Sequence, residues 1–286
     1  MIFDMPNTHR PVIDERRVME RLALVPVGWE DRYWLYVGVT GDRDQLVEAV
    51  RCYNTIPQVI GLKMFAGKSV GDLSVTEATD QQYVYRTLTD LRFRGVLAVH
   101  CEKESLLRPN RWRATVPASH CSARPTKAEA ESVKDQIRFA LDAEFQGRLH
   151  ICHVSSPKSI MAIEEGRHLG LRVTCGVTPH HLMWDRSTMV GEVGRLRKMN
   201  PPLRGKEDVT ALRDMVRIGL ANWFETDHAP HTQEEKLGEP YMSGYPSLEL
   251  YDEFVAQFLP QVVGLTSERI QAMTDGNIVE AFADKL

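Results

Sequence analysis

This 286-residue sequence lacks the signatures of a disulfide-rich, secreted or membrane-spanning protein. Its five cysteines are odd in number and include no Cys-x-x-Cys pair, which argues against a disulfide framework and favours a reducing compartment. No apolar stretch approaches the roughly 20 residues that a membrane-spanning helix needs. At the start of the chain, Asp4 and Pro6 interrupt the only apolar run, so no signal peptide is predicted. We therefore expect a cytoplasmic protein.

A surplus of positive charge is also missing. The sequence has 35 Lys and Arg residues against 39 Asp and Glu residues, which gives a net charge of −4 at pH 7. Such a chain offers no basic surface for nucleic acid or for an anionic membrane, and we expect neither as a partner. With 43% hydrophobic and 26% charged residues, the composition is that of an ordinary globular enzyme.

Short apolar runs alternate with amphipathic helical stretches, and no glycine-rich phosphate-binding fingerprint follows any of the runs. Most runs are too continuous for half-exposed strands, so we predict buried strands over Met1–Asp4, Trp34–Val39, Val59–Phe65, Gly95–His100, Arg148–Val154, Leu171–Val177 and Leu220–Thr226. Repeated β-then-α units imply parallel strands with right-handed crossovers. The missing fingerprint weakens the dinucleotide-binding alternative, a doubly wound open sheet.

The fold class that we predict is therefore α/β, as a (β/α)8 TIM-type barrel. A complete barrel has eight strands, whereas seven are predicted here, and the chain opens directly on a strand. We interpret the chain as a barrel that lacks its first β/α unit. No internal repeat or low-complexity linker divides it, so we expect a single domain over residues 1–286.

Several predicted helices carry recognisable start signals. The pairs Ser74 with Glu77 and Thr126 with Glu129 have the spacing of a capping box, in which each side chain satisfies a free backbone amide. Ser156 precedes a proline at the first helical position, as expected for an N-cap. Another helix, marked by Val209, Leu212 and Val216, precedes the last predicted strand.

Polar residues stand at or near the ends of four predicted strands. Lys63 lies inside an apolar run, His100 ends the next strand, His153 lies near the end of the one after, and Asp227 follows the last. Singly, each has a structural reading, such as a buried lysine that pairs with a carboxylate or an aspartate that caps a turn. Together they point to the carboxyl-terminal face where barrel enzymes place their chemistry. Imidazole and carboxylate ligands suit Zn²⁺, so we predict metal-assisted hydrolysis.

Seven short motifs occur in an order that resembles dihydroorotase, within the amidohydrolase superfamily. They are Asp4-Met5-Pro6-Asn7-Thr8, Gly61-Leu62-Lys63, His100-Cys101-Glu102, His150-Ile151-Cys152-His153-Val154-Ser155, Thr178-Pro179-His180-His181-Leu182, Asn200-Pro201-Pro202-Leu203-Arg204 and Thr226-Asp227-His228-Ala229-Pro230-His231-Thr232. The resemblance runs from Met1 to about Ala281. The first and the last two motifs are specific, whereas His-Val-Ser alone would not separate this family from hydantoinase, dihydropyrimidinase or allantoinase.

The resemblance implies a zinc centre with one or two ions. Lys63 would be carboxylated by CO₂ and bridge two metal ions, which turns a cation into an anionic ligand. His100 and His153 would hold the second of these metals. Asp227 would ligate the first metal and act as general base and general acid.

The resemblance also implies a substrate and the residues that bind it. Asn7, Asn200 and His231 would contact the carboxylate and the ring of the substrate, and Ser243-Gly244 would contact it through the backbone. The reaction would be the reversible interconversion of N-carbamoyl-L-aspartate and L-dihydroorotate, a step of pyrimidine synthesis. A homodimer is expected from the resemblance alone.

One element of the family pattern is missing, because the chain contains no His-x-His sequence anywhere. The family's first strand carries a His-x-His-x-Arg motif that holds the first metal and grips the substrate carboxylate. Three interpretations remain open: Met1 is an internal methionine with a further segment upstream, the protein is a non-catalytic relative that assembles with aspartate transcarbamoylase, or a partner chain or another ligand set completes a mononuclear site. Another cyclic amidohydrolase, of the hydantoinase or allantoinase type, is the alternative enzyme.

Three further polar groups have plainer interpretations. We expect Glu102 to orient a metal ligand or to meet a loop cation. His180 and His181 follow a strand and a proline, so a structural role is favoured over ligation. Glu234-Glu235-Lys236 is interpreted as a solvated loop.

Overall fold

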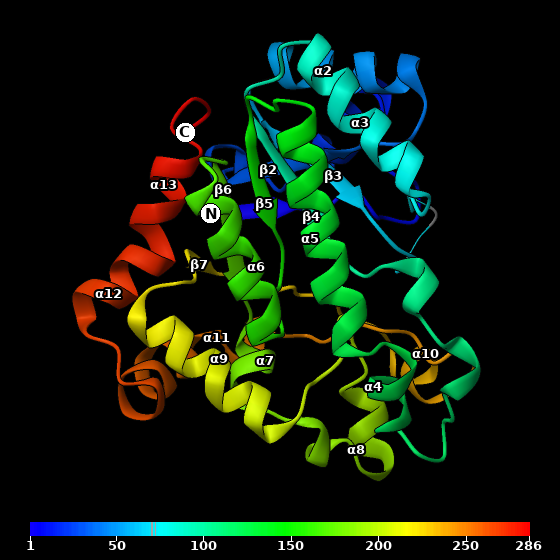
Figure 1. Ribbon diagram of the computed structural model, residues 1–286, viewed down its shortest axis with the longest axis vertical. Coiled ribbons are helices and arrows are strands. Elements are labelled where there is room, and N and C mark those ends of the chain that lie inside the picture. Colours follow the sequence, from blue (N-terminus) through cyan, green and yellow to red (C-terminus); the bar gives the residue numbers. More distant parts are fainter. Residues whose placement is uncertain (70, 72) are drawn as a thin grey trace.

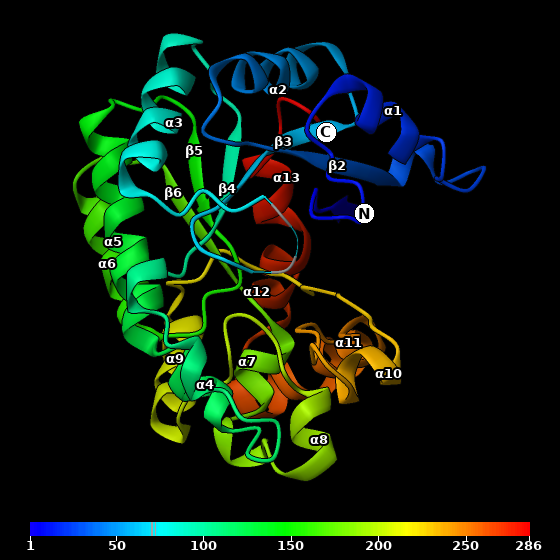
Figure 2. The ribbon, with the colours of Figure 1, turned by 90° about the vertical axis from the view of Figure 1, so that its right-hand side faces the viewer.

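A computed structural model describes residues 1–69, 71 and 73–286. Within these residues, seven parallel strands form one sheet and are hydrogen-bonded to each other in chain order. The strands are β1 (Ile2–Asp4), β2 (Tyr33–Gly38), β3 (Val59–Phe65), β4 (Val96–His100), β5 (Arg148–Ile151), β6 (Val173–Val177) and β7 (Trp223–Phe224). The sheet curls around its inner face (Figure 2), so the predicted α/β class and the barrel-type sheet are confirmed.

Helices connect the strands, as a series of parallel β/α units requires. They are α1 (Glu15–Leu22), α2 (Arg43–Thr55), α3 (Ala78–Asp90), α4 (Ser119–Ala123), α5 (Thr126–Asp142), α6 (Pro157–His168), α7 (Pro179–Met183), α8 (Gly191–Leu196), α9 (Lys206–Ile218), α10 (Gln233–Leu237), α11 (Leu248–Glu253), α12 (Ser267–Gln271) and α13 (Asn277–Ala281). Helices α3, α5 and α6 cover the outer face of the sheet, whereas α12 and α13 lie on its other side (Figures 1 and 2). In the described part of the chain, no helix combines the length and apolarity needed to cross a membrane.

Apolar side chains fill both faces of the curled sheet. The larger cluster joins the outward-facing strand residues, such as Leu62 and Leu97, to the surrounding helices. A smaller cluster lies inside the curl and includes Tyr36 and Trp223. Phe282, just after α13, closes this inner cluster, because its ring centroid lies 6.0 Å from that of Trp223 and 5.1 Å from that of Phe3. The C-terminal helices thus cover the inner face of the sheet at one end.

All seven predicted strands are present, but two end two or three residues earlier than predicted. The strand predicted over Arg148–Val154 ends at Ile151, and the last predicted strand is reduced to Trp223–Phe224. The chain turns sharply after both, because His153 has a φ of 39° and Asp227 a φ of 45°. A left-handed backbone cannot continue a strand. Two residues predicted to carry chemistry are therefore the residues at which the backbone leaves the sheet.

The predicted capping boxes are wrong, whereas the predicted Ser156 N-cap is confirmed. The backbone of Ser74 is held in a bridge with Phe65, so α3 begins only at Ala78. Helix α5 begins at Thr126 without a side-chain cap, because Glu129 is buried and bound to other groups. The Ser156 hydroxyl, by contrast, accepts a hydrogen bond from the backbone of Ser159.

Candidate active site at the carboxyl ends of the strands

Lys63 lies on the inner side of β3 and is almost completely buried, with 2% of its surface exposed. Its amine donates a hydrogen bond to the Cys152 thiol at 2.9 Å, and its Nζ lies 5.0 Å from the centroid of the Phe65 ring. In the described part of the chain, no carboxylate oxygen lies within 4.0 Å of this amine. A buried lysine with so few polar contacts is typical of a functional position, since burial of an unpaired charge is costly.

His100 ends β4 and His153 follows β5, and their rings meet. Nδ1 of His100 lies 3.1 Å from Nε2 of His153, and the two ring centroids are 4.9 Å apart. Burial lowers the pKa of both imidazoles, and the proximity of Lys63 lowers them further. Both rings are therefore neutral at physiological pH, which is the form that binds metal ions.

The Glu102 carboxylate orients the His100 ring. It lies 3.1 Å from Nε2 of His100 and also accepts hydrogen bonds from Arg124. Burial tends to raise the pKa of Glu102, but Arg124 and His100 lower it well below its usual range. An ionised Glu102 accepts a hydrogen bond from the Nε2–H group of His100, so Nδ1 of His100 presents a lone pair toward His153. The predicted orienting role of Glu102 agrees with this geometry.

These two histidines fit a bound metal ion. A hydrogen bond links Nδ1 of His100 and Nε2 of His153. A cation held between these two nitrogens would take the place of the proton in that hydrogen bond. The proton of the neutral His153 ring would then lie on Nδ1, a buried nitrogen that has no hydrogen-bond partner in the described structure. Two convergent neutral imidazoles are typical of Zn²⁺ sites.

Asp227 follows β7 at the same end of the sheet. Burial raises the pKa of its carboxyl to about 7, and the neighbouring Glu225 carboxylate raises it as well, whereas Lys63 acts in the opposite direction. Such a carboxyl exchanges a proton readily near neutral pH. Lys63, His100, His153 and Asp227 thus come from four different strands to one end of the curled sheet.

Comparison with known proteins agrees with this arrangement. No model of a known protein family matches the chain. A dihydroorotase from Listeria welshimeri is 34% identical over 244 residues, which are 82% of this chain and 53% of that protein. A dihydroorotase from Methanosarcina acetivorans is 31% identical over 250 residues, with 82% of this chain and 50% of that protein covered. The chain belongs to the dihydroorotase-like cyclic amidohydrolase family. It spans about half the length of the relatives that it matches.

Solved structures of cyclic amidohydrolases have the same fold. The L-hydantoinase (dihydropyrimidinase) of Arthrobacter aurescens superimposes with a TM-score of 0.80 at 18% identity, over 99% of this chain and 63% of the other. The dihydroorotase of Saccharomyces cerevisiae, solved with 5-fluoroorotic acid, gives a TM-score of 0.78 at 18% identity, over 98% of this chain and 76% of the other. At such low identity these similarities establish the barrel-type fold alone.

A second group of donors lies beside the metal ligands predicted for this amidohydrolase chain. Glu225 reaches back from the end of β7, where its carboxylate contacts Nε2 of His150 and accepts from the backbone N–H of His153 at 2.7 Å. Burial by itself lowers the pKa of His150, but Glu225 reverses the effect and raises it to about 9. Trp223 stacks on His150 at 4.4 Å between centroids and donates to Glu225 at 3.2 Å.

Sequence reasoning missed this group. The donor atoms of His150, Cys152 and Glu225 all lie within 4.8 Å of one another, so these residues could also hold a metal ion. Gly176 leaves the space for Glu225, because a Cβ added there would lie 2.2 Å from the Glu225 Cδ. The available signal was a glycine inside one predicted strand and a carboxylate inside the next. Only the register, which pairs Gly176 with Trp223, shows that the two positions are adjacent.

The residues predicted to bind substrate lie in three places. His231 contacts the backbone carbonyl of Ser243 at 3.2 Å, and Gly244, with a φ of 153°, lies so close to His231 that a Cβ would approach its ring to 2.8 Å. The side-chain oxygen of Asn200 instead accepts a hydrogen bond from Nε2 of His120 at 3.0 Å. Asn7 lies near Gly71, where an added Cβ would come within 3.5 Å of the Asn7 side chain.

A buried lysine joins the two loops that carry Asn200 and Gly244. Lys236 donates to the carbonyls of Lys198 at 2.8 Å and Gly244 at 2.6 Å, and the Gly244 N–H also donates to the Lys198 carbonyl. Burial, together with Lys198, lowers the pKa of Lys236 to about 7. The prediction of a solvated loop over residues 234–236 is therefore only partly right: Glu234 and Glu235 are exposed, but residues 233–237 form the helix α10 and Lys236 is 4% exposed.

The adjacent histidines after β6 have different surroundings. His181 bonds to the Thr178 hydroxyl at 2.7 Å and to the Pro201 carbonyl at 2.9 Å, which agrees with a structural role. His180 is fully buried, and neither of its ring nitrogens has a hydrogen-bond partner within the described structure. Burial lowers its pKa well below the usual range, so the ring is neutral.

Proposed function

We propose that this chain catalyses the reversible interconversion of L-dihydroorotate and N-carbamoyl-L-aspartate, as a zinc-dependent dihydroorotase. The observation that carries the proposal is the 3.1 Å contact between the ring nitrogens of the neutral His100 and His153. These nitrogens would hold one zinc ion, with Asp227 and a carboxylated Lys63 as further ligands. His150, Cys152 and Glu225 offer a second donor set next to it.

The residues of the chain have distinct tasks in this reaction. When bound, a zinc ion supplies Lewis acidity toward water and toward an amide carbonyl. The Asp227 carboxylate would take a proton from the attacking water in the hydrolytic direction. As the ring C–N bond breaks, Asp227 returns that proton to the leaving nitrogen, so that water is added across the bond. The same steps in reverse close the ring.

Carboxylation of Lys63 needs a local rearrangement. The neutral amine attacks CO₂, a C–N bond forms, and one proton leaves, which makes an anionic carbamate. The present hydrogen bond from Lys63 to the Cys152 thiol would then be broken. Binding of a cation by His100 and His153 would favour this change, because the cation attracts the negative charge of the carbamate.

Substrate recognition is assigned to the loops after the strands. His231, Asn200 and Asn7 would bind the carboxylate and the ring, and Ser243 and Gly244 would contact the ring through the backbone. Relatives at 31–34% identity that are dihydroorotases favour this substrate over a hydantoin. The Asn-Pro-Pro-Leu-Arg segment that begins at Asn200 agrees with a ring that bears a carboxylate.

The test is turnover of L-dihydroorotate by the 286-residue chain supplied with Zn²⁺ and bicarbonate, compared with a chelated sample. We expect zinc-dependent turnover that Asp227→Asn lowers by at least about 100-fold, since general acid–base catalysis contributes about 10² to 10⁴. Asp252→Asn, at an exposed position on α11, is the matched control and should retain full activity. Hydantoin and dihydrouracil, assayed in parallel, identify the alternative cyclic amidohydrolases.

A non-catalytic role, as a scaffold for aspartate transcarbamoylase, is the second candidate. One observation favours it: the Lys63 amine is engaged by the Cys152 thiol. This role predicts no turnover of any of the three substrates, and complex formation with aspartate transcarbamoylase on size-exclusion chromatography. Near-normal turnover by Asp227→Asn would contradict the mechanism proposed above.

A further inference from the structure

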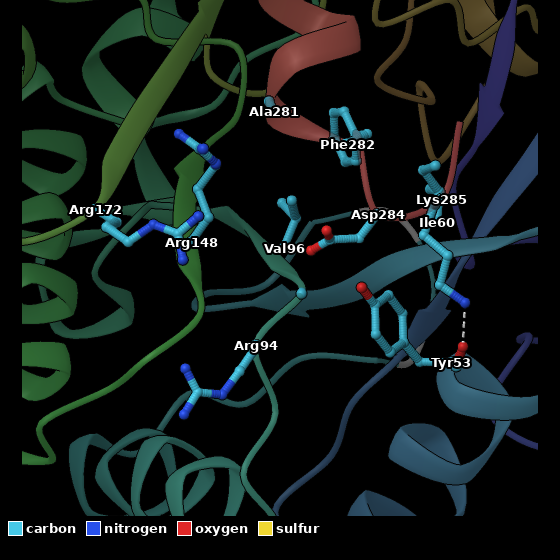
Figure 3. Close-up of a pocket in the computed structure, with 11 residues that line it drawn as sticks. Tyr53, Ile60, Arg94, Val96, Arg148, Arg172, Ala281, Phe282, Asp284 and Lys285 are labelled. Atoms are coloured by element: carbon cyan, nitrogen blue, oxygen red, sulfur yellow. Dashed lines mark hydrogen bonds between the residues drawn. The ribbon is translucent and has the colours of Figure 1, made fainter.

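A pocket rich in arginine lies at the opposite end of the sheet from the candidate active site. Its walls come from the amino-terminal ends of three neighbouring strands, which contribute Arg94, Arg148 and Arg172, and from Asp284 and Lys285 at the end of the chain. Figure 3 shows the three arginines on one side of the pocket and Asp284 and Lys285 on the other. The cavity is small, about 20 Å³, and is partly open to solvent.

The arginines of this pocket have no acidic partner. In the described part of the chain, no carboxylate oxygen lies within 4.0 Å of Arg94, Arg148 or Arg172. Nε of Arg148 is buried and has no hydrogen-bond partner. Most buried N–H groups are paired, so an unpaired N–H on an arginine that lines a pocket indicates a missing acceptor.

The electrostatics agree with a missing anion. Burial, and then the neighbouring Arg172, lower the pKa of Arg148, which Glu280 and Asp284 offset only in part. Lys285 is directed to the other wall, where it donates to the backbone carbonyl of Tyr53 and lies 4.2 Å from the centroid of the Tyr53 ring. The four cations and two carboxylates named here leave a net charge of +2.

We propose that this pocket binds a small dianionic oxyanion, such as a phosphate group. Guanidinium groups bind phosphate oxygens through directed, charge-assisted hydrogen bonds. A dianion would give the buried Nε of Arg148 an acceptor and would offset the net charge of the pocket. The site is separate from the catalytic end of the sheet and does not depend on the proposed function.

The experiment is titration of the chain with inorganic phosphate by isothermal calorimetry, in a buffer of constant ionic strength. We expect one phosphate per chain, and a loss of affinity of about tenfold or more in both Arg148→Gln and Arg172→Gln, since a hydrogen bond to a charged group is worth that factor. Arg86→Gln, at an exposed position on α3, is the matched control and should bind as the parent chain does. Asp284→Asn should bind phosphate more tightly, because it removes a like charge.

Additional titrations identify the ligand, and a thermal unfolding measurement shows whether the variants are folded. Glycerol 3-phosphate, added in place of inorganic phosphate, separates a phosphate ester from the free ion, and chloride at the same ionic strength measures screening alone. Thermal unfolding in phosphate-free buffer should show both arginine variants to be at least as stable as the parent chain, because each relieves repulsion. Failure of the parent chain to bind phosphate or its ester, or equal binding by all variants, would overturn the proposal.

Discussion

Arg204 and Glu129 form a buried ion pair whose loss should destabilise the end of the sheet that carries the candidate active site. Nη2 of Arg204 lies 2.9 Å from the Glu129 carboxylate, and the two side chains are each 2% exposed. Arg204 also donates to the Ser155 hydroxyl at 2.8 Å and to the Arg124 carbonyl at 2.7 Å. Ser159 donates to Glu129 at 2.7 Å. The pair thereby joins α5, the loop after His153 and the loop after Asn200.

Replacement of Arg204 by Met leaves a carboxylate buried without a counter-charge. Breaking a buried ion pair on one side costs about 3–5 kcal/mol, which is a large share of the stability of a typical domain. We expect Arg204→Met to lower the free energy of unfolding by this amount. Arg217→Met is the matched control, because Arg217 pairs with Asp214 at 2.6 Å on the surface and both side chains are about half exposed. An exposed pair is worth at most about 1 kcal/mol.

The second substitution, Glu129→Gln, separates charge from packing. Added to Arg204→Met, it removes the unpaired charge but keeps an acceptor for Ser155 and Ser159, so the double variant should recover about 1–2 kcal/mol relative to Arg204→Met. Urea unfolding, followed by far-ultraviolet circular dichroism, measures the free energies of unfolding of the parent chain, Arg204→Met, the double variant and the Arg217→Met control. A cost below about 1 kcal/mol for Arg204→Met, or a double variant as unstable as Arg204→Met, would refute this reasoning.

Two further predictions concern Lys236 and Gly67. The pKa of Lys236 is about 7 in the folded chain and about 10.4 in the unfolded chain. Between these two pH values the unfolded state binds more protons than the folded state. The free energy of unfolding should therefore rise with pH in this range, by up to about 1.4 kcal/mol per pH unit. Urea unfolding from pH 7 to 8.5 should show a shallower rise for Lys236→Met than for the parent chain, and equal slopes would contradict the assignment. At Gly67 an added Cβ would lie 1.8 Å from the Glu102 carbonyl oxygen, so Gly67→Ala must shift backbone and should cost about 1–3 kcal/mol. It should also weaken zinc binding by displacing His100; unchanged stability and zinc affinity would contradict that contact.

The sequence predicted the local elements well wherever one kind of residue dominated a stretch. Continuous apolar runs such as Val59–Phe65 correctly indicated buried strands, and Ser156 with Pro157 correctly indicated a helix start. The two capping boxes failed because their spacing describes only local hydrogen bonds. Glu129 found stronger partners in Arg204 and Ser159, which the spacing does not include.

The same difference between local sequence patterns and tertiary contacts applies to the residues predicted for the metal centre. Strand-end positions placed Lys63, His100, His153 and Asp227 at one end of the sheet, as parallel strands require. Their present contacts could not be predicted, because the Lys63 amine meets a thiol 89 positions further along the chain. The roles of these four residues, and those of Asn7, Asn200, His231, Ser243 and Gly244, remain predictions, as do the homodimer and the single domain.

The sequence alone thus determined the α/β class, the order of the strands and the end at which polar residues gather, because these follow from periodicity along the chain. Only the tertiary structure decided which side chains pair. Glu225 meets His150 and Glu129 meets Arg204, each across 75 positions, and Arg148 and Arg172 line one pocket where β5 and β6 begin side by side. Such pairs depend on strand register and on the curl of the sheet, which bring together residues that no local pattern relates.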